Sequence, residues 1–224
     1  MSEETPTRTG FLAKIGDNLE LVTAILLGLV SIATAYASFQ GALYDSMMAG
    51  SYAKGTQLST EAESLYLEGN QQFMQDTQVF NQLSELQVGI DKGEPLAQEK
   101  YDTLFFQGGS EEFGAAIDNA AAATEADPEF FYSPLDDEDY QAFLFSGYAD
   151  ADTASKAETA KGDEYNTLSD KLTLYTVIMA VSLFLFGIAA LLRERRTQLV
   201  LLGTGIVLSG LAIVLTLQIP FVSI

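Results

Sequence analysis

The chain of 224 residues contains no Cys, no His and no Trp. Without Cys it can form neither a disulfide nor a thiolate nucleophile, and without Cys and His it lacks the usual ligands of structural zinc and the His or Cys ligands of haem iron. Ser-His-Asp and Cys-His catalytic groups are excluded for the same reason. We therefore expect a protein that is not an enzyme and that carries no cofactor.

Basic residues are also scarce, with 11 Lys and Arg against 31 Asp and Glu. Residues 45–171 hold 26 acidic and 6 basic residues, a balance of −20 that equals the net charge of the whole chain. Nucleic acid and anionic lipid headgroups would be repelled by such a segment. This charge predicts a divalent cation or a basic protein as the partner and no nucleic acid, although it is also typical of an acidic or salt-adapted proteome.

Apolar residues are concentrated in three uncharged runs: Leu21 to Tyr44, Leu172 to Leu192, and Thr197 to Ile224. Each is longer than the ~20 residues that cross a ~30 Å hydrocarbon layer as a helix. The sequence therefore predicts an all-α membrane protein with three transmembrane helices. None of the runs contains an Asp, Glu, Lys or Arg, which disfavours autonomous transport because ion and proton pathways depend on such groups.

Orientation follows from the Lys and Arg residues that flank the runs, since these favour the cytoplasmic side. Arg193, Arg195 and Arg196 lie between the second and third runs, and Arg8 and Lys14 precede the first. We expect a multi-pass protein of the plasma membrane, with its N-terminus cytoplasmic and its C-terminus extracytoplasmic. The first run could instead be a cleaved signal peptide, but its length and the acidic residues before it favour a retained span.

The predicted organisation thus has seven segments. They are a cytoplasmic N-terminal segment (1–18), a first transmembrane helix (19–44), an acidic extracytoplasmic helical bundle (45–171), a second transmembrane helix (172–192), a cytoplasmic Arg-rich turn (193–198), a third transmembrane helix (199–219) and an extracytoplasmic C-terminus (220–224).

The acidic segment has the pattern of helices. No Pro occurs between Tyr44 and Glu94, and apolar or small residues recur there at alternating spacings of three and four, which marks one helical face. We expect the first span to continue outward as a helix to about residue 90. Two short helices should follow, the second capped by Ser110 and ending before Pro128. A last helix should lead into the second span, and no strand is expected.

Two sets of residues are candidates for binding. The first is an acidic cluster whose oxygen atoms could hold a divalent cation, or could simply face the positive end of a helix dipole. It consists of Asp136, Asp137, Glu138 and Asp139. The second consists of small residues in the spans, which let helix backbones approach within the chain or in contact with another protein. These are Gly28, Ser31, Ala35, Gly203, Gly205, Ser209 and Gly210.

Several short motifs also occur in a group of uncharacterised three-pass membrane proteins common in actinobacteria and some other bacteria, which this sequence resembles. The motifs are the run Ala35 to Gln40, Tyr52-Ala53, Glu61-Ala62, Gln72, Asp76, Phe80, and the run Ser182 to Ala189. The resemblance covers nearly the whole chain. It implies three spans and no known reaction.

Together these features predict a non-enzymatic accessory or scaffold subunit. Its spans would dock on other subunits of a larger membrane complex, such as a respiratory or envelope complex, while the acidic module contacts an extracytoplasmic partner. The alternative is an extracytoplasmic sensor of a ligand or cation. A sensor of this kind would lack its own output domain, because only residues 193–198 return to the cytoplasm after the second span.

Overall fold

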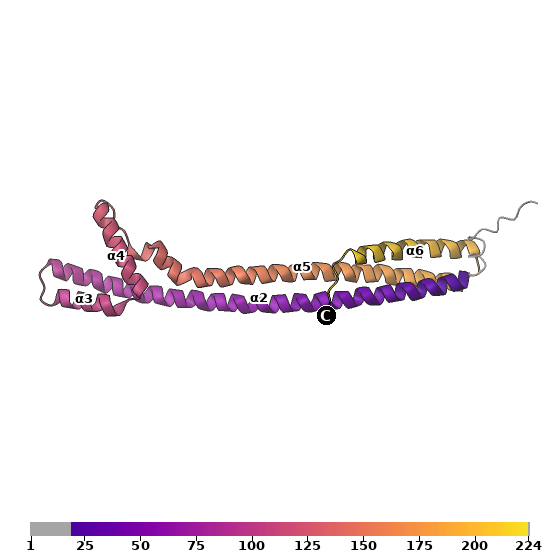
Figure 1. Cartoon of the computed structure of the whole chain (residues 1–224), viewed down its shortest axis with the longest axis horizontal. Coiled ribbons are helices and arrows are strands. Elements are labelled where there is room, and N and C mark those ends of the chain that lie inside the picture. The colour runs from indigo at the N-terminus through magenta and orange to yellow at the C-terminus, as the bar shows by residue number, and fades with distance from the viewer. Residues whose placement is uncertain (1–18, 224) are drawn as a thin grey trace, which may run out of the picture. The chain divides into compact units, whose positions relative to one another are not determined.

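The computed structural model describes residues 19–223. Within that range the chain is helical and contains no strand, which confirms the predicted all-α class (Figure 1). The predicted cytoplasmic segment 1–18 lies outside the described residues. The elements are α2 (Leu19–Asp91), α3 (Ala97–Gly108), α4 (Glu111–Ala126), the 3-10 helix η1 (Pro134–Asp136), α5 (Glu138–Leu191) and α6 (Arg195–Leu217).

Three of these helices, α2, α5 and α6, are long and apolar enough to cross a membrane. The chain thus has the features of a multi-pass membrane protein, as the three uncharged runs predict. Helix α6 begins at Arg195, after the Glu194 N-cap. Arg195 and Arg196 therefore lie in the first turn of a helix, and of the predicted Arg-rich turn (193–198) only residues 193 and 194 are non-helical.

The chain forms two compact units. The first contains the described residues 19–51 together with 160–223, and the second spans Tyr52–Thr159. Helices α2 and α5 each contribute one part to both units.

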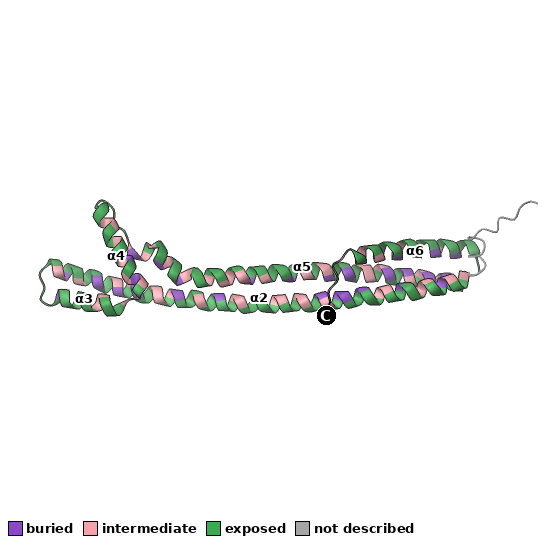
Figure 2. Ribbon diagram, in the orientation of Figure 1, coloured by how far each residue is buried: buried purple, intermediate pink, exposed green. Residues whose placement is uncertain are grey.

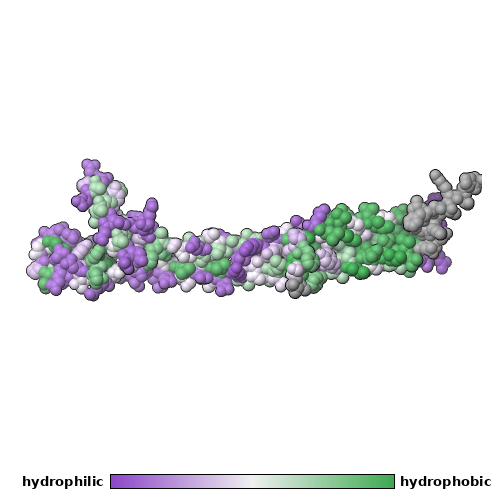
Figure 3. Space-filling view, in the orientation of Figure 1, coloured by the Kyte–Doolittle hydropathy of each residue, from purple (hydrophilic) through white to green (hydrophobic). Residues whose placement is uncertain are grey.

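The core of the first unit is formed by α2, α5 and α6, with Leu202 and Ala212 buried on α6. The buried residues Val30, Ala37 and Tyr44 follow one another at intervals of seven on α2. Leu172, Met179 and Phe186 do the same on α5. Figure 2 shows buried positions recurring along both helices. A seven-residue repeat keeps one face of each helix turned toward the other, as in coiled coils. Hydrophobic side chains also cover much of the face of this unit that Figure 3 shows, as expected for helices that contact lipid.

The segment after α6 folds back onto α2 within the same unit. The side-chain amide of Gln40 donates to the carbonyl of Val222 at 3.2 Å, and its oxygen accepts from the Val222 backbone N–H at 3.0 Å. The Tyr44 hydroxyl donates to the carbonyl of Pro220 at 2.7 Å. These bonds satisfy backbone groups that α6 can no longer pair once it has ended.

Four buried hydroxyl groups in the three apolar helices are satisfied by their own helix. Thr23, Ser182, Ser209 and Thr216 each donate to the backbone carbonyl four residues earlier. Such local bonds remove the cost of an unpaired hydroxyl in an apolar environment without linking one helix to another. Ser169 on α5 differs, because its hydroxyl lies 2.6 Å from the Asp45 carboxylate and 3.3 Å from the Gly41 carbonyl, both on α2. Side-chain packing and this one polar link therefore both join α5 to α2 in the first unit.

In the second unit α2 and α5 run antiparallel and approach closely at two glycines. A Cβ atom built on Gly55 would lie 2.7 Å from the Thr159 hydroxyl, and one built on Gly69 would collide with the Leu144 carbonyl. At these two positions only a residue without a side chain lets the helices approach this closely. The adjoining core is formed by Val79, Leu83, Phe113, Ala116, Tyr140 and Leu144, which joins α2, α4 and α5.

Candidate functional site

The most buried charged side chain of the second unit is Asp76 on α2, with an exposed fraction of 0%. It accepts hydrogen bonds from the Ser110 backbone N–H at 3.1 Å, from the Ser110 hydroxyl at 3.0 Å and from the Tyr140 hydroxyl at 2.9 Å. The Gln72 amide, one helical turn earlier on α2, donates to both carboxylate oxygens at 3.1 Å. One carboxylate therefore ties together α2, the start of α4 and the first turn of α5.

Two of the donors to the Asp76 carboxylate come from the starts of helices, Ser110 from α4 and Tyr140 from α5. Ser110 is the N-cap of α4 and its hydroxyl also accepts from the Phe113 N–H, as predicted. A negative charge next to a helix N-terminus is stabilised by the helix dipole and by unpaired N–H groups. Burial raises the pKa of Tyr140 above its usual range, and the hydrogen bond to Asp76 and the charge of that carboxylate raise it further.

This arrangement is suited to holding helices together. Its carboxylate is inaccessible, and both oxygens already accept hydrogen bonds from protein groups. A buried charge with several donors is costly to disturb, because removal of a donor leaves the carboxylate partly unsatisfied. We therefore interpret Asp76 as a structural residue that joins α2, α4 and α5 in the second unit, and we call this contact the junction.

The predicted acidic cluster lies where η1 leads into α5. Asp137 accepts from the Tyr140 backbone N–H at 2.9 Å and from the Asn119 amide at 3.1 Å. The first bond is the side-chain N-cap of α5. These two bonds, the backbone bond foremost, lower the pKa of Asp137. The remaining members of the cluster are exposed and are Asp136, Glu138 and Asp139.

No group of three or more acidic side chains within residues 19–223 is arranged to hold a metal ion. Capping of α5 accounts for the position of Asp137, and the acidic first turn that follows suits the helix dipole. A divalent cation at Asp136 to Asp139 stays a prediction.

The predicted small residues of the spans fall into two classes. Gly205 and Ser209 are buried, and a Cβ atom on Gly205 would lie 2.5 Å from the Phe186 ring. These two allow α6 to pack on α5. The others are exposed on the first unit, and they are Gly28, Ser31, Ala35, Gly203 and Gly210. Around Gly28, Gly203 and Gly210 a Cβ atom would meet nothing within 4 Å.

Arg193, Arg195 and Arg196 are all exposed around the short connection between α5 and α6. None makes an ion pair within the part of the chain that the structure describes. Their positive charge is therefore available to groups outside the chain.

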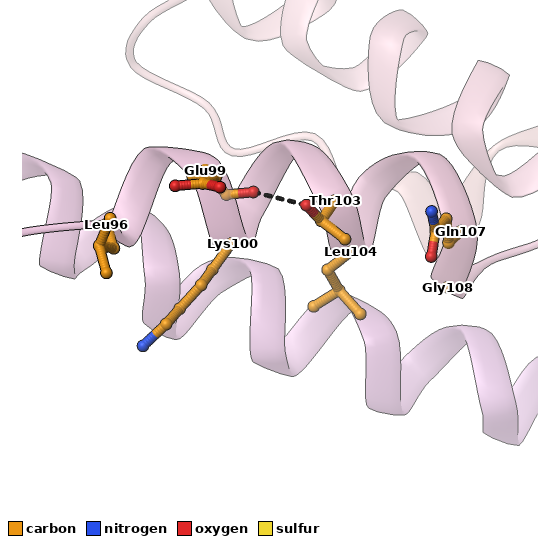
Figure 4. Close-up of a pocket in the computed structure, with 7 residues that line it drawn as sticks. All are labelled: Leu96, Glu99, Lys100, Thr103, Leu104, Gln107 and Gly108. Carbon is orange, nitrogen blue, oxygen red and sulfur yellow. Dashed lines mark hydrogen bonds between the residues drawn. The ribbon is translucent and has the colours of Figure 1, made fainter.

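The second unit exposes large apolar side chains despite its acidic surface. Phe106 at the end of α3 has an exposed fraction of 87%, and Phe131, between α4 and η1, has one of 69%. A shallow groove of about 530 Å³ follows α3 from Leu96 to Gly108 (Figure 4). In Figure 4 the Thr103 hydroxyl donates to the Glu99 carbonyl on the helix, while the Lys100 side chain extends away from it.

A second cleft, of about 490 Å³, lies between α4 and the segment that leads into α5. Its α4 side is formed by the small residues Ala120 and Ala123 together with Asn119. The opposite side carries aromatic and acidic residues, namely Phe130, Phe131, Tyr132, Ser133, Asp136 and Asp137.

The charge around this cleft has one sign. Residues 101–155 contain 13 Asp or Glu and no Lys or Arg. Two ion pairs on this unit lie elsewhere, between Lys54 and Glu158 at 3.0 Å and between Lys156 and Asp152 at 2.6 Å. The aromatic rings of the cleft therefore lie in a part of the chain with a large excess of negative charge.

Comparison of the chain with protein-family models, with curated proteins and with solved structures finds no match in any of the three.

Proposed function

We propose that this chain is a non-enzymatic accessory or scaffold subunit of a larger membrane complex. Its apolar helices would dock on other subunits, and its second unit would present an acidic surface outside the cytoplasm to a partner protein. The observation that carries the proposal is the exposure of Phe106, Phe130 and Phe131 on an otherwise acidic module. Exposed aromatic residues on a polar background are typical of surfaces that become covered by another protein.

The first unit offers a surface for the docking of other spans. Gly28, Gly203 and Gly210 are exposed with open space around their Cα atoms. In a membrane such positions let a foreign helix approach closely, which increases van der Waals contact between backbones. Packing within the chain already uses Gly205, so the exposed glycines are left for lateral association.

The proposed orientation rests on the arginines next to α6. Arg195 and Arg196 occupy the first turn of that helix, where the dipole disfavours positive charge. The stability of α6 therefore does not explain why Arg residues occupy these two positions. Retention of the connection between α5 and α6 in the cytoplasm would explain them. The N-terminus would then be cytoplasmic, and both the second unit and the C-terminus extracytoplasmic.

The orientation can be tested directly because the chain contains no Cys. Single Cys residues would be introduced by Glu125→Cys on α4 and by Glu194→Cys between α5 and α6, both at exposed positions. A membrane-impermeant maleimide applied to intact cells should label the first variant and spare the second. The reverse pattern would overturn the orientation and the proposed extracytoplasmic partner.

The accessory role is tested by purification of the tagged full-length protein from native membranes in mild detergent, followed by crosslinking and mass spectrometry. We expect a companion in constant ratio to the chain. The matched control is a chain with Gly203→Leu and Gly210→Leu, which blocks the open face of α6 and should lose that companion. A wild-type chain that purifies alone, also after crosslinking in the membrane, would refute the role.

A sensor of a ligand or cation is the second candidate, favoured by the groove along α3. Leu96, at one end of this groove, adopts φ of 67°, a left-handed conformation that a Leu side chain rarely occupies. Backbone strain of this kind often accompanies binding sites. Thermal unfolding of the full chain in detergent, with panels of small molecules and divalent cations, should show ligand-dependent stabilisation if this role is correct. A flat response would count against it.

A further inference from the structure

We propose that the cleft between α4 and residues 130–137 binds a positively charged side chain of a basic protein segment, held by aromatic rings and carboxylates together. The site would be the contact through which the acidic module recognises its partner, and in this sense it rests on the proposed accessory function.

The first argument is the composition of the walls. Phe130, Phe131 and Tyr132 all line the cleft, and the rings of Phe130 and Tyr132 lie edge to face at 4.9 Å. The faces of aromatic rings attract cations through their quadrupole. A set of rings that served only to fill a core would be buried, whereas Phe130 and Phe131 are exposed by 59% and 69%.

The second argument is the position of the carboxylates. Asp136 and Asp137 line the same cleft as the rings. Asp137 is held in place by the Tyr140 N–H and Asn119. The exposed Asp136 hydrogen-bonds through its backbone N–H to the Ser133 carbonyl, and its carboxylate could pair with an incoming cation. An Arg guanidinium could stack on a ring and donate charge-assisted hydrogen bonds to a carboxylate at the same time, and a neutral or anionic group lacks both of these charge-dependent attractions.

The third argument is the space available. Ala120 and Ala123 form the α4 side of the cleft, where larger residues would fill the volume. A volume of about 490 Å³ is within the range of sites that enclose small groups. No Lys or Arg occurs in residues 101–155 to occupy the cleft from nearby in the chain. Charge complementarity thus selects a basic segment over an apolar or acidic one.

The test is isothermal titration calorimetry of the full-length protein in lipid nanodiscs with an N-acetylated, C-amidated tetra-arginine peptide. The neutral tetra-citrulline peptide, which has nearly the same shape, should not bind measurably. The double variant Phe130→Leu and Phe131→Leu keeps the apolar volume and removes two rings. We expect its Kd to rise about tenfold, because each exposed cation–π contact is worth roughly a two- to fivefold change.

Matched charge variants separate the cleft from the general acidic field. Asp136→Asn and Asp150→Asn each remove one exposed negative charge from the second unit, but only Asp136 lines the cleft. We expect Kd to rise about threefold for the first and by less than about 1.5-fold for the second, since distant exposed charges are screened. Equal effects of the two, or an unchanged Kd in the ring variant, would overturn the proposal.

A cleft-filling variant guards against a folding defect in the ring variant. Ala123→Trp retains every charge and every ring while occupying the cleft, and it should abolish binding of tetra-arginine with an unchanged circular dichroism spectrum. Full binding by this folded variant would refute the site.

If the cleft behaves as expected but no companion co-purifies with the chain, the accessory role fails and the site stands. If a companion co-purifies while peptide binding ignores all cleft variants, the site fails and the accessory role stands.

Discussion

The Tyr140 hydroxyl donates a 2.9 Å hydrogen bond to the Asp76 carboxylate, joining two residues that are 64 positions apart in the chain. Both side chains are almost fully buried. A hydrogen bond to a charged group in such a place contributes more than one between neutral groups. This contact, together with those of Ser110, attaches the start of α5 and the start of α4 to α2.

Tyr140→Phe should lower the free energy of unfolding by about 1 to 3 kcal/mol, because it leaves a buried carboxylate with one donor fewer. Thermal unfolding of the full chain in detergent, followed by circular dichroism, provides the measurement. Tyr66→Phe is the matched control, since the Tyr66 ring is half-exposed and its loss of a hydroxyl should change stability by less than about 0.5 kcal/mol. Equal stability of the two variants would show that the junction contributes little.

Stability should also fall at alkaline pH through Tyr140. Burial, the hydrogen bond to Asp76 and the charge of that carboxylate raise the pKa of Tyr140 in the folded chain. Below about pH 10 the residue is protonated in both states and its contribution is fully present. Above about pH 10 the unfolded chain loses the proton first, so stability declines. Tyr140→Phe should remove this part of the decline in unfolding measured between pH 8 and 11, whereas Tyr66→Phe should retain it.

Asp137→Ala should lower stability by about 1 kcal/mol at neutral pH, because the α5 N-terminus loses its side-chain cap. Asp137→Asn should cost much less, since an amide oxygen can accept from the Tyr140 N–H. The lowered pKa of Asp137 places its charge-dependent contribution above the ordinary value of 3.8. That contribution should disappear as pH falls below this value. Asp136→Ala, next to it in the chain, should be nearly neutral; a loss equal to that of Asp137→Ala would contradict the capping role.

Gly69→Ala should destabilise the second unit by about 2 kcal/mol or more, since a methyl group at this position would collide with the Leu144 backbone and force the helices apart. Gly114→Ala on α4 is the control, because a Cβ atom there meets nothing within 4 Å. Ala is a better helix former than Gly by up to about 1 kcal/mol, so the control should be neutral or stabilising. Protease resistance of the full chain at increasing temperature would rank the stability of the variants. If Gly69→Ala is as stable as the wild-type chain, α2 and α5 are farther apart at this position than the structure places them.

Much of the local structure could be predicted from the sequence because its causes are local. The absence of Pro between Leu19 and Pro95 allows α2 to continue to Asp91, and Ser110 caps α4 as its residue type and following acidic residues indicate. Charge-free runs of the required length identify the three apolar helices. In each case the decisive interaction lies within a few residues along the chain.

The junction and the cleft depend on contacts that sequence spacing does not give. Asp76 lies on the same face of α2 as Gly69, Val79 and Leu83, and an acidic residue within an apolar face is the signal that could have located it. Its partners Ser110 and Tyr140, however, become neighbours only after α3 and α4 have folded back. The aromatic residues 130–132 likewise form a cleft only because the following segment packs against α4.

The two glycines of α6 that differ most in surroundings offer a test of lateral association. Gly205→Ala would bring a methyl group to 2.5 Å from the Phe186 ring, so it should lower the thermal stability of the isolated chain in detergent. Gly203→Ala meets nothing within the chain and should leave that stability unchanged or slightly higher. If α6 docks on another subunit through its open face, Gly203→Ala should instead weaken co-purification of the companion, because even one methyl group separates closely packed helices. The companion could instead be lost with Gly205→Ala and still co-purify normally with Gly203→Ala and Gly203→Leu. That result would show that association depends on the fold of the first unit and not on the open face of α6.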